Sequence, residues 1–369
     1  MSNNNGINTY NFAVNHSEAA KLVATCGQDV TYVFEGEPGV GKSSILTTLS
    51  TMLGDEYEYI YVDVPNKDAP DIALCMPDHI KKVTAYYINE TWLGADRTKK
   101  KCIMLDEINK GPEYVQLMMN RLVHEHVIGT YKLPEGSRVF GTTNFTTDGV
   151  GDSSNAHSNS RIVRVPFRKP SQEEYNHWGI NNGLNPIVLK WCDQNPMVFQ
   201  SYKDTEFNAN EHKDGVGAFH YIFHPQHNAH AYVCPRSMHK ASKQIDSIDT
   251  LGEALLVKAL IGTIGAKAAL DMSALIALGN DMPDPKDVVS APESARIPKS
   301  EAAQIMLVYK SVQHLTPTNI SAWVTYFERY PLEMLSVWVK TVIKNESVKM
   351  FFIKDPKIRA FAINNSWVL

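Results

Sequence analysis

Short apolar runs, rich in β-branched residues, alternate with amphipathic stretches over the first half of the chain. The stretches near residues 43–52 and 113–124 have the periodicity of helices, whereas the short runs between turn residues predict strands. Such alternation is typical of an α/β fold built on a parallel sheet. The predicted strands cover residues 31–34, 59–64, 102–105, 138–142 and 162–165.

The pattern becomes helical after residue 170. Helices are predicted at residues 173–179 and 186–195, and almost throughout the chain after Pro235. Near the end of the chain, apolar side chains recur at the spacing of one helical face. They are Leu332, Leu335, Val339 and Ile343.

Two segments interrupt this helical half. Residues 202–232 are polar and rich in His, Asn and Gly, which predicts a long loop or insertion. Residues 282–298 carry four prolines and are predicted to be a linker. Because a chain of 369 residues exceeds the usual size of one domain, we predict three regions. They are an α/β core at residues 1–170, a helical domain at 171–281 and a helical C-terminal region at 282–369.

The overall composition argues against some classes of protein. Hydrophobic residues make up 43% of the chain and charged residues 21%, which is the usual balance of a globular protein. The net charge of −4 argues against a surface that is one continuous nucleic-acid footprint, although a local basic stripe is compatible with it. Five scattered cysteines without a CxxC pair predict a reduced, intracellular protein.

No segment of the sequence predicts membrane targeting or insertion. The first residues are polar and lack the pattern of a signal peptide. The most apolar stretch, residues 254–278, is interrupted by Lys258, Lys267 and Asp271, which is too much charge for a lipid-spanning helix. We therefore predict a buried pair of helices at this stretch, and we expect a cytoplasmic protein.

A glycine-rich sequence, G-E-P-G-V-G-K-S at residues 36–43, follows the first predicted strand and precedes a predicted helix. This is the context that a phosphate-binding Walker A loop requires. Its backbone N–H groups would surround phosphate oxygens, Lys42 would neutralise the β- and γ-phosphates, and the Ser43 hydroxyl would ligate Mg²⁺. The residues predicted to bind ATP are Gly36, Glu37, Pro38, Gly39, Val40, Gly41, Lys42, Ser43 and Ser44.

Two acidic residues follow the predicted strand at residues 102–105. In open α/β sheets, ligands bind at the carboxyl ends of the strands. Asp106 is therefore predicted to hold the Mg²⁺ shell, and Glu107 to polarise the attacking water as general base. Asn144, at the end of the next predicted strand, would orient that water. Together with the Walker A loop, this set predicts a nucleotide hydrolase.

These motifs resemble those of the MoxR-like branch of the AAA+ ATPases. The resemblance is carried by the Walker A sequence, by L-D-E-I-N-K-G-P at residues 105–112 and by T-T-N at 142–144. It continues through S-R-I-V-R-V at residues 160–165 and Y-V-C-P-R-S at 232–237, and so extends over nearly the whole chain. It implies an AAA+ P-loop NTPase core with a parallel sheet, followed by an α-helical lid and a C-terminal helical region.

The resemblance also implies roles for residues outside the two Walker motifs. Asn144 would be sensor 1, and Arg236, at the start of a helical domain, would be sensor 2. Arg161 would be the arginine finger that reaches the γ-phosphate bound by the neighbouring subunit, with Arg164 as the alternative. Glycine and proline residues predict a hairpin or turn within residues 126–139. The resemblance implies that roughly residues 125–136 correspond to an insertion that faces the pore.

Proteins of this family assemble as ring-shaped hexamers and commonly act with a partner that carries a von Willebrand A domain. The resemblance thus implies an ATP-driven, chaperone-like remodelling motor with a protein substrate. A nucleic-acid motor or loader built on the same core is an alternative, although the acidic net charge weighs against it. A nucleotide-switched assembly scaffold is a third possibility.

Three further features are assigned no chemistry. The histidines between residues 220 and 230, with Cys234, fit no closed zinc pattern and predict a hydrated loop. The basic run at residues 99–101 predicts a solvated face. Five aromatic residues of the tail lie at helical spacing and predict core packing rather than base stacking. They are Trp323, Tyr326, Phe327, Tyr330 and Trp338.

Overall fold

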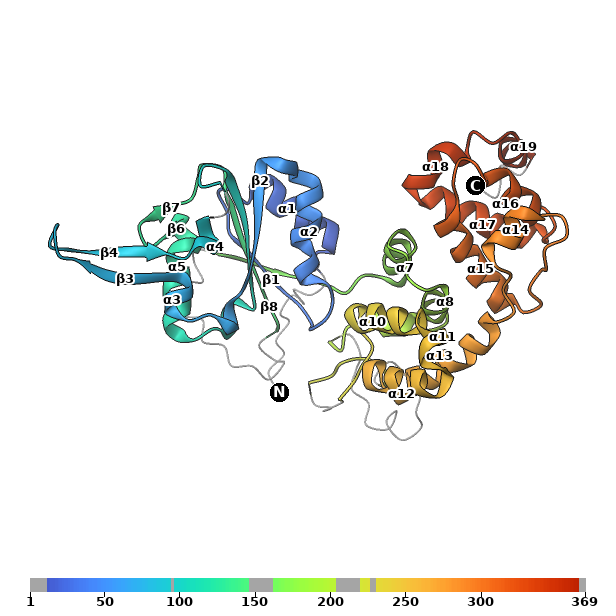
Figure 1. Cartoon of the computed structure of the whole chain (residues 1–369), viewed down its shortest axis with the longest axis horizontal. Helices are drawn as coiled ribbons and strands as arrows, with labels where there is room; N and C mark the ends of the chain where they lie inside the picture. Colours follow the sequence, from blue (N-terminus) through green and yellow to red (C-terminus); the bar gives the residue numbers. More distant parts are fainter. Residues whose placement is uncertain (1–11, 94–95, 146–161, 204–219, 226–229, 365–369) are drawn as a thin grey trace, which may run out of the picture. The chain divides into compact units, whose positions relative to one another are not determined.

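The computed structural model describes five stretches of the chain (Figure 1), namely residues 12–93, 96–145, 162–203, 220–225 and 230–364. The chain divides into two compact units. The first is Met1–Lys169 with His224–Gln226, and the second is Pro170–Phe223 with His227–Leu369. The division into three regions stated above stays a prediction.

Five parallel strands form the central sheet of the first unit, in the order β2-β5-β8-β1-β9. Each of them overlaps a strand that the hydrophobic pattern predicts. Because all neighbouring pairs are parallel, the carboxyl ends of the five strands meet at one edge of the sheet. The strands are β1 (Tyr32–Glu35), β2 (Tyr57–Asp63), β5 (Lys100–Asp106), β8 (Arg138–Thr143) and β9 (Val163–Pro166).

Helices cover both faces of this sheet: α1 and α2 lie on one face and α5 lies on the other (Figure 1). Successive side chains of a strand point to opposite faces. From β5, Cys102 and Met104 therefore pack in the cluster beneath α1 and α2, whereas Ile103 and Leu105 pack beneath α5. Burial on both faces explains why this strand is an uninterrupted apolar run. The three helices are α1 (His16–Cys26), α2 (Ile45–Leu53) and α5 (Glu113–Glu125).

Two antiparallel hairpins belong to the same unit. The strands β6 (Val127–Ile128) and β7 (Tyr131–Lys132) form a hairpin within residues 126–139, where a hairpin or turn was predicted. The strands β3 (Ala73–Asp78) and β4 (Val83–Ile88) form a hairpin that the sequence pattern did not predict, because most of its side chains are exposed. Short helices connect β2 to β5, namely η4 (Val64–Asn66), α3 (Ala69–Ile72) and α4 (Glu90–Leu93).

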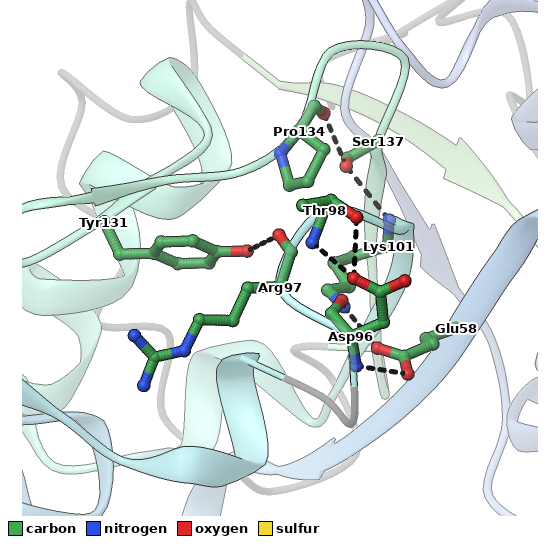
Figure 2. Close-up of polar contacts among 8 residues, drawn as sticks. All are labelled: Glu58, Asp96, Arg97, Thr98, Lys101, Tyr131, Pro134 and Ser137. Atoms are coloured by element: carbon green, nitrogen blue, oxygen red, sulfur yellow. Dashed lines mark hydrogen bonds and ion pairs between the residues drawn. The ribbon is translucent and has the colours of Figure 1, made fainter.

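A buried lysine lies at the amino end of β5, on the edge of the sheet opposite the carboxyl ends. Lys101 is fully buried, and its ammonium contacts the Glu58 carboxylate and the Asp96 carbonyl oxygen (Figure 2). Its backbone N–H donates to Ser137 Oγ at 3.0 Å. The prediction that residues 99–101 form a solvated face is therefore wrong for Lys101, because a paired carboxylate compensates the burial of its charge.

Helices α7 to α19 make up the second unit, in which a single bridge joins Ile222 and Val233 within the described residues. No helix in the described part of the chain has the length and apolar character needed to cross a membrane. The helices are α7 (Gln172–Asn181), α8 (Pro186–Gln194), η7 (Pro196–Phe199), α10 (Pro235–Ile245), α11 (Ile248–Leu251), α12 (Glu253–Ile264), α13 (Ala266–Gly279), α14 (Pro285–Ser290), α15 (Glu301–His314), α16 (Ile320–Phe327), α17 (Leu332–Lys344), α18 (Glu346–Phe352) and α19 (Pro356–Asn364).

Packing in the second unit confirms one expectation and overturns another. The aromatic residues of the tail are core residues as predicted, and the Phe327 and Trp338 rings stack with centroids 4.4 Å apart. The proline-rich segment 282–298 is not a free linker, because it contains α14 with a fully buried Val288. Arg329 also donates to the carbonyl oxygens of Pro292 and Ala295. These contacts hold the segment against α16 and the turn that follows it.

Candidate nucleotide-binding site

The loop between β1 and α2 has the backbone of a phosphate-binding loop. Gly39 and Gly41 have φ angles of 76° and 102°, in the left-handed region that glycine adopts without steric cost. Gly36 leaves no room for a side chain, because a Cβ atom there would lie 2.6 Å from the carbonyl oxygen of Phe167. The short helix η2 (Lys42–Ser44) then leads into α2. The loop therefore presents backbone N–H groups and the start of a helix, and both stabilise a bound anion.

Lys42 is buried, and its ammonium faces three oxygen atoms. Nζ donates to the carbonyl oxygens of Gly36 at 2.7 Å and Glu37 at 2.8 Å, and to Asn144 Oδ1 at 2.8 Å. An ammonium has three N–H donors, so these contacts occupy all of them. The structure thus brings two residues with predicted roles, Lys42 and Asn144, into direct contact at the carboxyl edge of the sheet.

Asp106 lies beside Ser43 at the same edge. Ser43 Oγ donates to Asp106 Oδ2 at 3.1 Å, and the Tyr61 hydroxyl donates to the same oxygen at 2.7 Å. Thr142 Oγ1 donates to Asp106 Oδ1. A hydroxyl and a carboxylate oxygen are ligands that Mg²⁺ takes together with water and phosphate oxygens, so Ser43 and Asp106 fit a Mg²⁺ site. The two supporting residues, Tyr61 and Thr142, were not among the predicted site residues.

Glu107 has a left-handed backbone, with a φ angle of 54°. This conformation is uncommon for a residue other than glycine, and such strain is found at functional sites. Its Oε2 atom lies 3.0 Å from Nζ of Lys110 in the short helix η5 (Ile108–Lys110). The outlier favours the hypothesis that Glu107 acts in chemistry.

His16, which the sequence did not indicate, contacts the loop from α1. The Ser44 hydroxyl donates to the Gly41 carbonyl oxygen at 2.6 Å, which uses its only proton. The 3.0 Å contact between Ser44 Oγ and His16 Nε2 therefore requires the imidazole to donate. Burial lowers the pKa of His16, whereas a backbone contact with Ser44 raises it. The first helix thus holds the end of the phosphate-binding loop.

The three predicted arginines have different surroundings. Arg161, predicted as the finger, lies outside the described residues. Arg164, the alternative, is in β9 and forms an ion pair with Glu35 of the same unit. Arg236 is the second residue of α10 in the second unit, where it is exposed. The structure therefore gives Arg164 a partner within its own chain.

The cluster of histidines and Cys234 gains no support as a metal site. His224 and Cys234 are buried, and His227 lies outside the described residues. In the stretches that the structure describes, no group of three or more His, Cys, Asp or Glu side chains could hold a metal ion. The Ser43–Asp106 pair does not conflict with this, because phosphate and water oxygens would complete its coordination.

Comparison with protein families places the phosphate-binding loop, both acidic residues and Asn144 in one domain. Residues 32–148 match the model of the AAA domain of the dynein-related subfamily. With the parallel sheet described above, this part of the chain has the AAA+ P-loop NTPase fold, and a helical C-terminal region follows it. The domain is of the kind found in AAA+ ATPases. A search of curated proteins found no match.

Several solved structures are distantly similar. A mutant RuvB from Thermotoga maritima is 10% identical, with 76% of this chain and 75% of that chain covered and a TM-score of 0.37. NtrX from Brucella abortus, solved in complex with ADP, is 13% identical, with coverage of 96% and 68% and a TM-score of 0.31. Hsp104, solved with ATPγS and casein, is 16% identical, with coverage of 72% and 46% and a TM-score of 0.36. At these values, the roles of individual residues rest on this chain alone.

Replacing Thr142 by Val will weaken Mg²⁺-dependent activity. The variant keeps the shape of the side chain but removes the hydrogen bond to Asp106 Oδ1, so the carboxylate loses part of its orientation. We expect the Mg²⁺ concentration for half-maximal ATP hydrolysis to rise roughly 10–100-fold, the usual effect of losing a residue that supports a metal ligand. Thr143→Val, next along the strand and without a contact to Asp106, is the control. Equal Mg²⁺ dependence in the two variants would contradict the prediction.

Proposed function

We propose that this protein is an ATP-hydrolysing, AAA+ remodelling motor of the MoxR-like type, which acts as a ring of identical subunits on a protein substrate. The observation that carries the proposal is the convergence of Lys42, Ser43, Asp106 and Asn144 at the carboxyl edge of the sheet, next to Glu107. This set contains a cation for the phosphates, two oxygen ligands for Mg²⁺ and a carboxylate that can accept a proton.

The proposed reaction is attack of water on the γ-phosphorus of ATP, in line with the bond to ADP. Glu107 accepts the proton of the water, the bond between the γ-phosphorus and the bridging oxygen breaks, and ADP leaves with phosphate as the second product. Asn144 orients the water and Lys42 offsets charge on the phosphate oxygens. Bound Mg²⁺ supplies further charge neutralisation at the phosphates. Ser43 and Asp106 hold it there.

The ring is proposed from the resemblance to the MoxR-like AAA+ ATPases, in which an arginine finger acts across a subunit boundary. Arg161 is proposed as the finger that completes the site of the neighbouring subunit, in a hexamer. Arg236 is proposed as sensor 2. The proposed substrate is a protein, and the proposed partner carries a von Willebrand A domain. The net charge of −4 and the family match together give no specific support to a nucleic-acid substrate.

The test is hydrolysis of MgATP by the purified chain, measured as phosphate release, alongside Lys42→Ala. We expect the wild-type chain to hydrolyse ATP and the variant to lose both ATP binding and turnover, because the variant lacks the ammonium proposed to neutralise the phosphates. Mass measurement with and without MgATP should show assembly of the wild-type chain. Turnover in Lys42→Ala equal to wild type would overturn the proposed site. Strong stimulation by DNA or RNA that falls steeply with salt would overturn the proposed substrate class.

A further inference from the structure

A buried ion pair joins the phosphate-binding loop to the end of the first unit. Glu37 lies within the loop, and its Oε2 atom is 2.8 Å from Nζ of Lys169. The two side chains are 1% and 3% exposed. Lys169 is the last residue of the first unit before Pro170 begins the second. The pair therefore links the loop to the point at which the chain leaves the α/β unit.

The backbone before Lys169 is hydrogen-bonded to β1, which leads into the loop, and to Val14. Phe167 N–H donates to the Glu35 carbonyl oxygen at 2.7 Å, and Arg168 N–H donates to the Val14 carbonyl oxygen at 3.0 Å. Gly36 approaches the Phe167 carbonyl so closely that only glycine fits there. A shift of the loop backbone at residues 36 and 37 would therefore be transmitted to residues 167–169 by direct contact.

Lys42 contacts the backbone of Glu37, and the proposed function gives it the phosphates of ATP as ligands. Its ammonium donates to the carbonyl oxygen of Glu37 at 2.8 Å, and its other N–H donors face Gly36 and Asn144. A phosphate that takes Lys42 as a partner must replace at least one of these three bonds, because an ammonium has three donors. The backbone of Glu37 cannot easily turn helical in response, because Pro38 follows it.

We propose that the Glu37–Lys169 ion pair couples occupancy of the phosphate-binding loop to the conformation of the chain where the two units join. The coupling rests on the proposed function, since it requires that the loop binds ATP. In the structure Lys42 donates to two loop carbonyl oxygens and to Asn144, and Glu37 pairs with Lys169. A phosphate that binds Lys42 replaces at least one of its bonds to Gly36, Glu37 and Asn144. The loop backbone then shifts, and the ion pair passes this shift to residues 167–170. Glu37 and Lys169 are positioning residues and touch no reacting atom.

A purely structural role for this pair makes a different prediction. Buried ion pairs contribute little net stability compared with apolar residues of similar size, whereas removing one partner leaves an unpaired buried charge and destabilises the fold. If the pair only stabilises the unit, a double neutral variant should fold and respond to MgATP as wild type does. Coupling through the pair predicts that the double variant folds but that the response of the junction to MgATP is lost.

The experiment is hydrogen–deuterium exchange on the full-length chain, with and without MgATP, for wild type, Glu37→Gln and the double variant Glu37→Gln/Lys169→Met. The readout is the exchange of amides in residues 166–176, compared with amides in residues 36–44. For wild type we expect MgATP to change the exchange rates of amides both in the loop and at the junction. In the double variant we expect the loop amides to respond and the junction amides not to respond.

The control is Glu58→Gln, which removes the partner of the equally buried Lys101 at the opposite edge of the sheet (Figure 2). This variant loses stability by the same physical cause but should keep the junction response. A wild-type response at the junction in the folded double variant would overturn the coupling. Absence of any MgATP response in residues 36–44 of the wild-type chain would instead overturn the proposed function, so the two failures are distinguishable.

Discussion

Replacing Glu107 by Gln will leave the chain able to bind MgATP but will lower its hydrolysis rate by roughly 10²–10⁴, the range that a general base contributes. The amide matches the carboxylate in size, so the strained left-handed turn at residue 107 can persist. It cannot accept the proton of the attacking water. Lys42, Ser43 and Asp106, the residues proposed to bind the phosphates and Mg²⁺, are unchanged, and the hydrogen bonds of Lys42 and Ser43 described above do not involve Glu107. Binding is measured with a fluorescent ATP analogue and turnover as phosphate release.

The matched control is Glu113→Gln, because the same chemical change is made at an exposed position at the start of α5. It should leave binding and turnover unaltered. Hydrolysis by Glu107→Gln at the wild-type rate would show that another group accepts the proton. Loss of ATP binding in Glu107→Gln would show instead that this residue shapes the pocket. Either result would remove Glu107 as the general base.

The centre of the sheet could be predicted from the sequence because β5 and β8 are buried on both faces. Residues such as Ile103 and Met104 face opposite layers, so an uninterrupted apolar run marks the strand without ambiguity. The β3–β4 hairpin has no such signal. Leu74 and Tyr87 pair across it, yet 45% and 65% of their surfaces stay exposed, so the pattern of burial does not alternate along either strand.

The site could be predicted where its chemistry is local in the sequence. The glycines and Lys42 belong to one continuous motif, and Asp106 and Glu107 directly follow an apolar run. Tyr61 and His16 could not be found in this way, because each reaches the site through the tertiary arrangement of strands and helices. Their partners lie 45 and 28 residues away in the chain. A single sequence carries no local signal for such pairs.

The buried pair of Glu37 and Lys169 escaped prediction for the same reason. Glu37 was predicted to belong to the ATP-binding loop. The partner of its side chain, Lys169, follows β9 and lies 132 positions later in the sequence. Lys101 shows the opposite error. It was predicted to be exposed because it belongs to a basic run, but its side chain is fully buried. Runs of charged residues indicate average exposure, whereas burial of one member depends on whether a specific partner is in reach.

Replacing Arg161 by Ala will lower hydrolysis of the assembled protein by roughly 10³–10⁵, the effect of an arginine finger supplied by a neighbour. ATP affinity of the single subunit should change little, because the finger acts on a nucleotide that another subunit binds. Arg164→Ala is the matched variant, with the same substitution three positions further along the chain. Its guanidinium pairs with Glu35, so its loss should lower thermal stability and leave the rate within a fewfold of wild type.

An experiment with two variants mixed in one ring shows whether Arg161 or Arg164 is the finger, because a finger acts on the nucleotide bound by the neighbouring subunit. A ring of Arg161→Ala subunits has intact Glu107, and a ring of Glu107→Gln subunits has intact fingers. In mixed rings, an Arg161→Ala subunit beside a Glu107→Gln subunit regains a complete site, so hydrolysis should return although each variant alone is inactive. Recovery cannot occur if Arg161 acts only within its own chain. The opposite outcome is that Arg161→Ala is active, whereas Arg164→Ala is inactive alone and is rescued by Glu107→Gln subunits. Arg164 is then the finger, and its ion pair with Glu35 must break when the ring assembles.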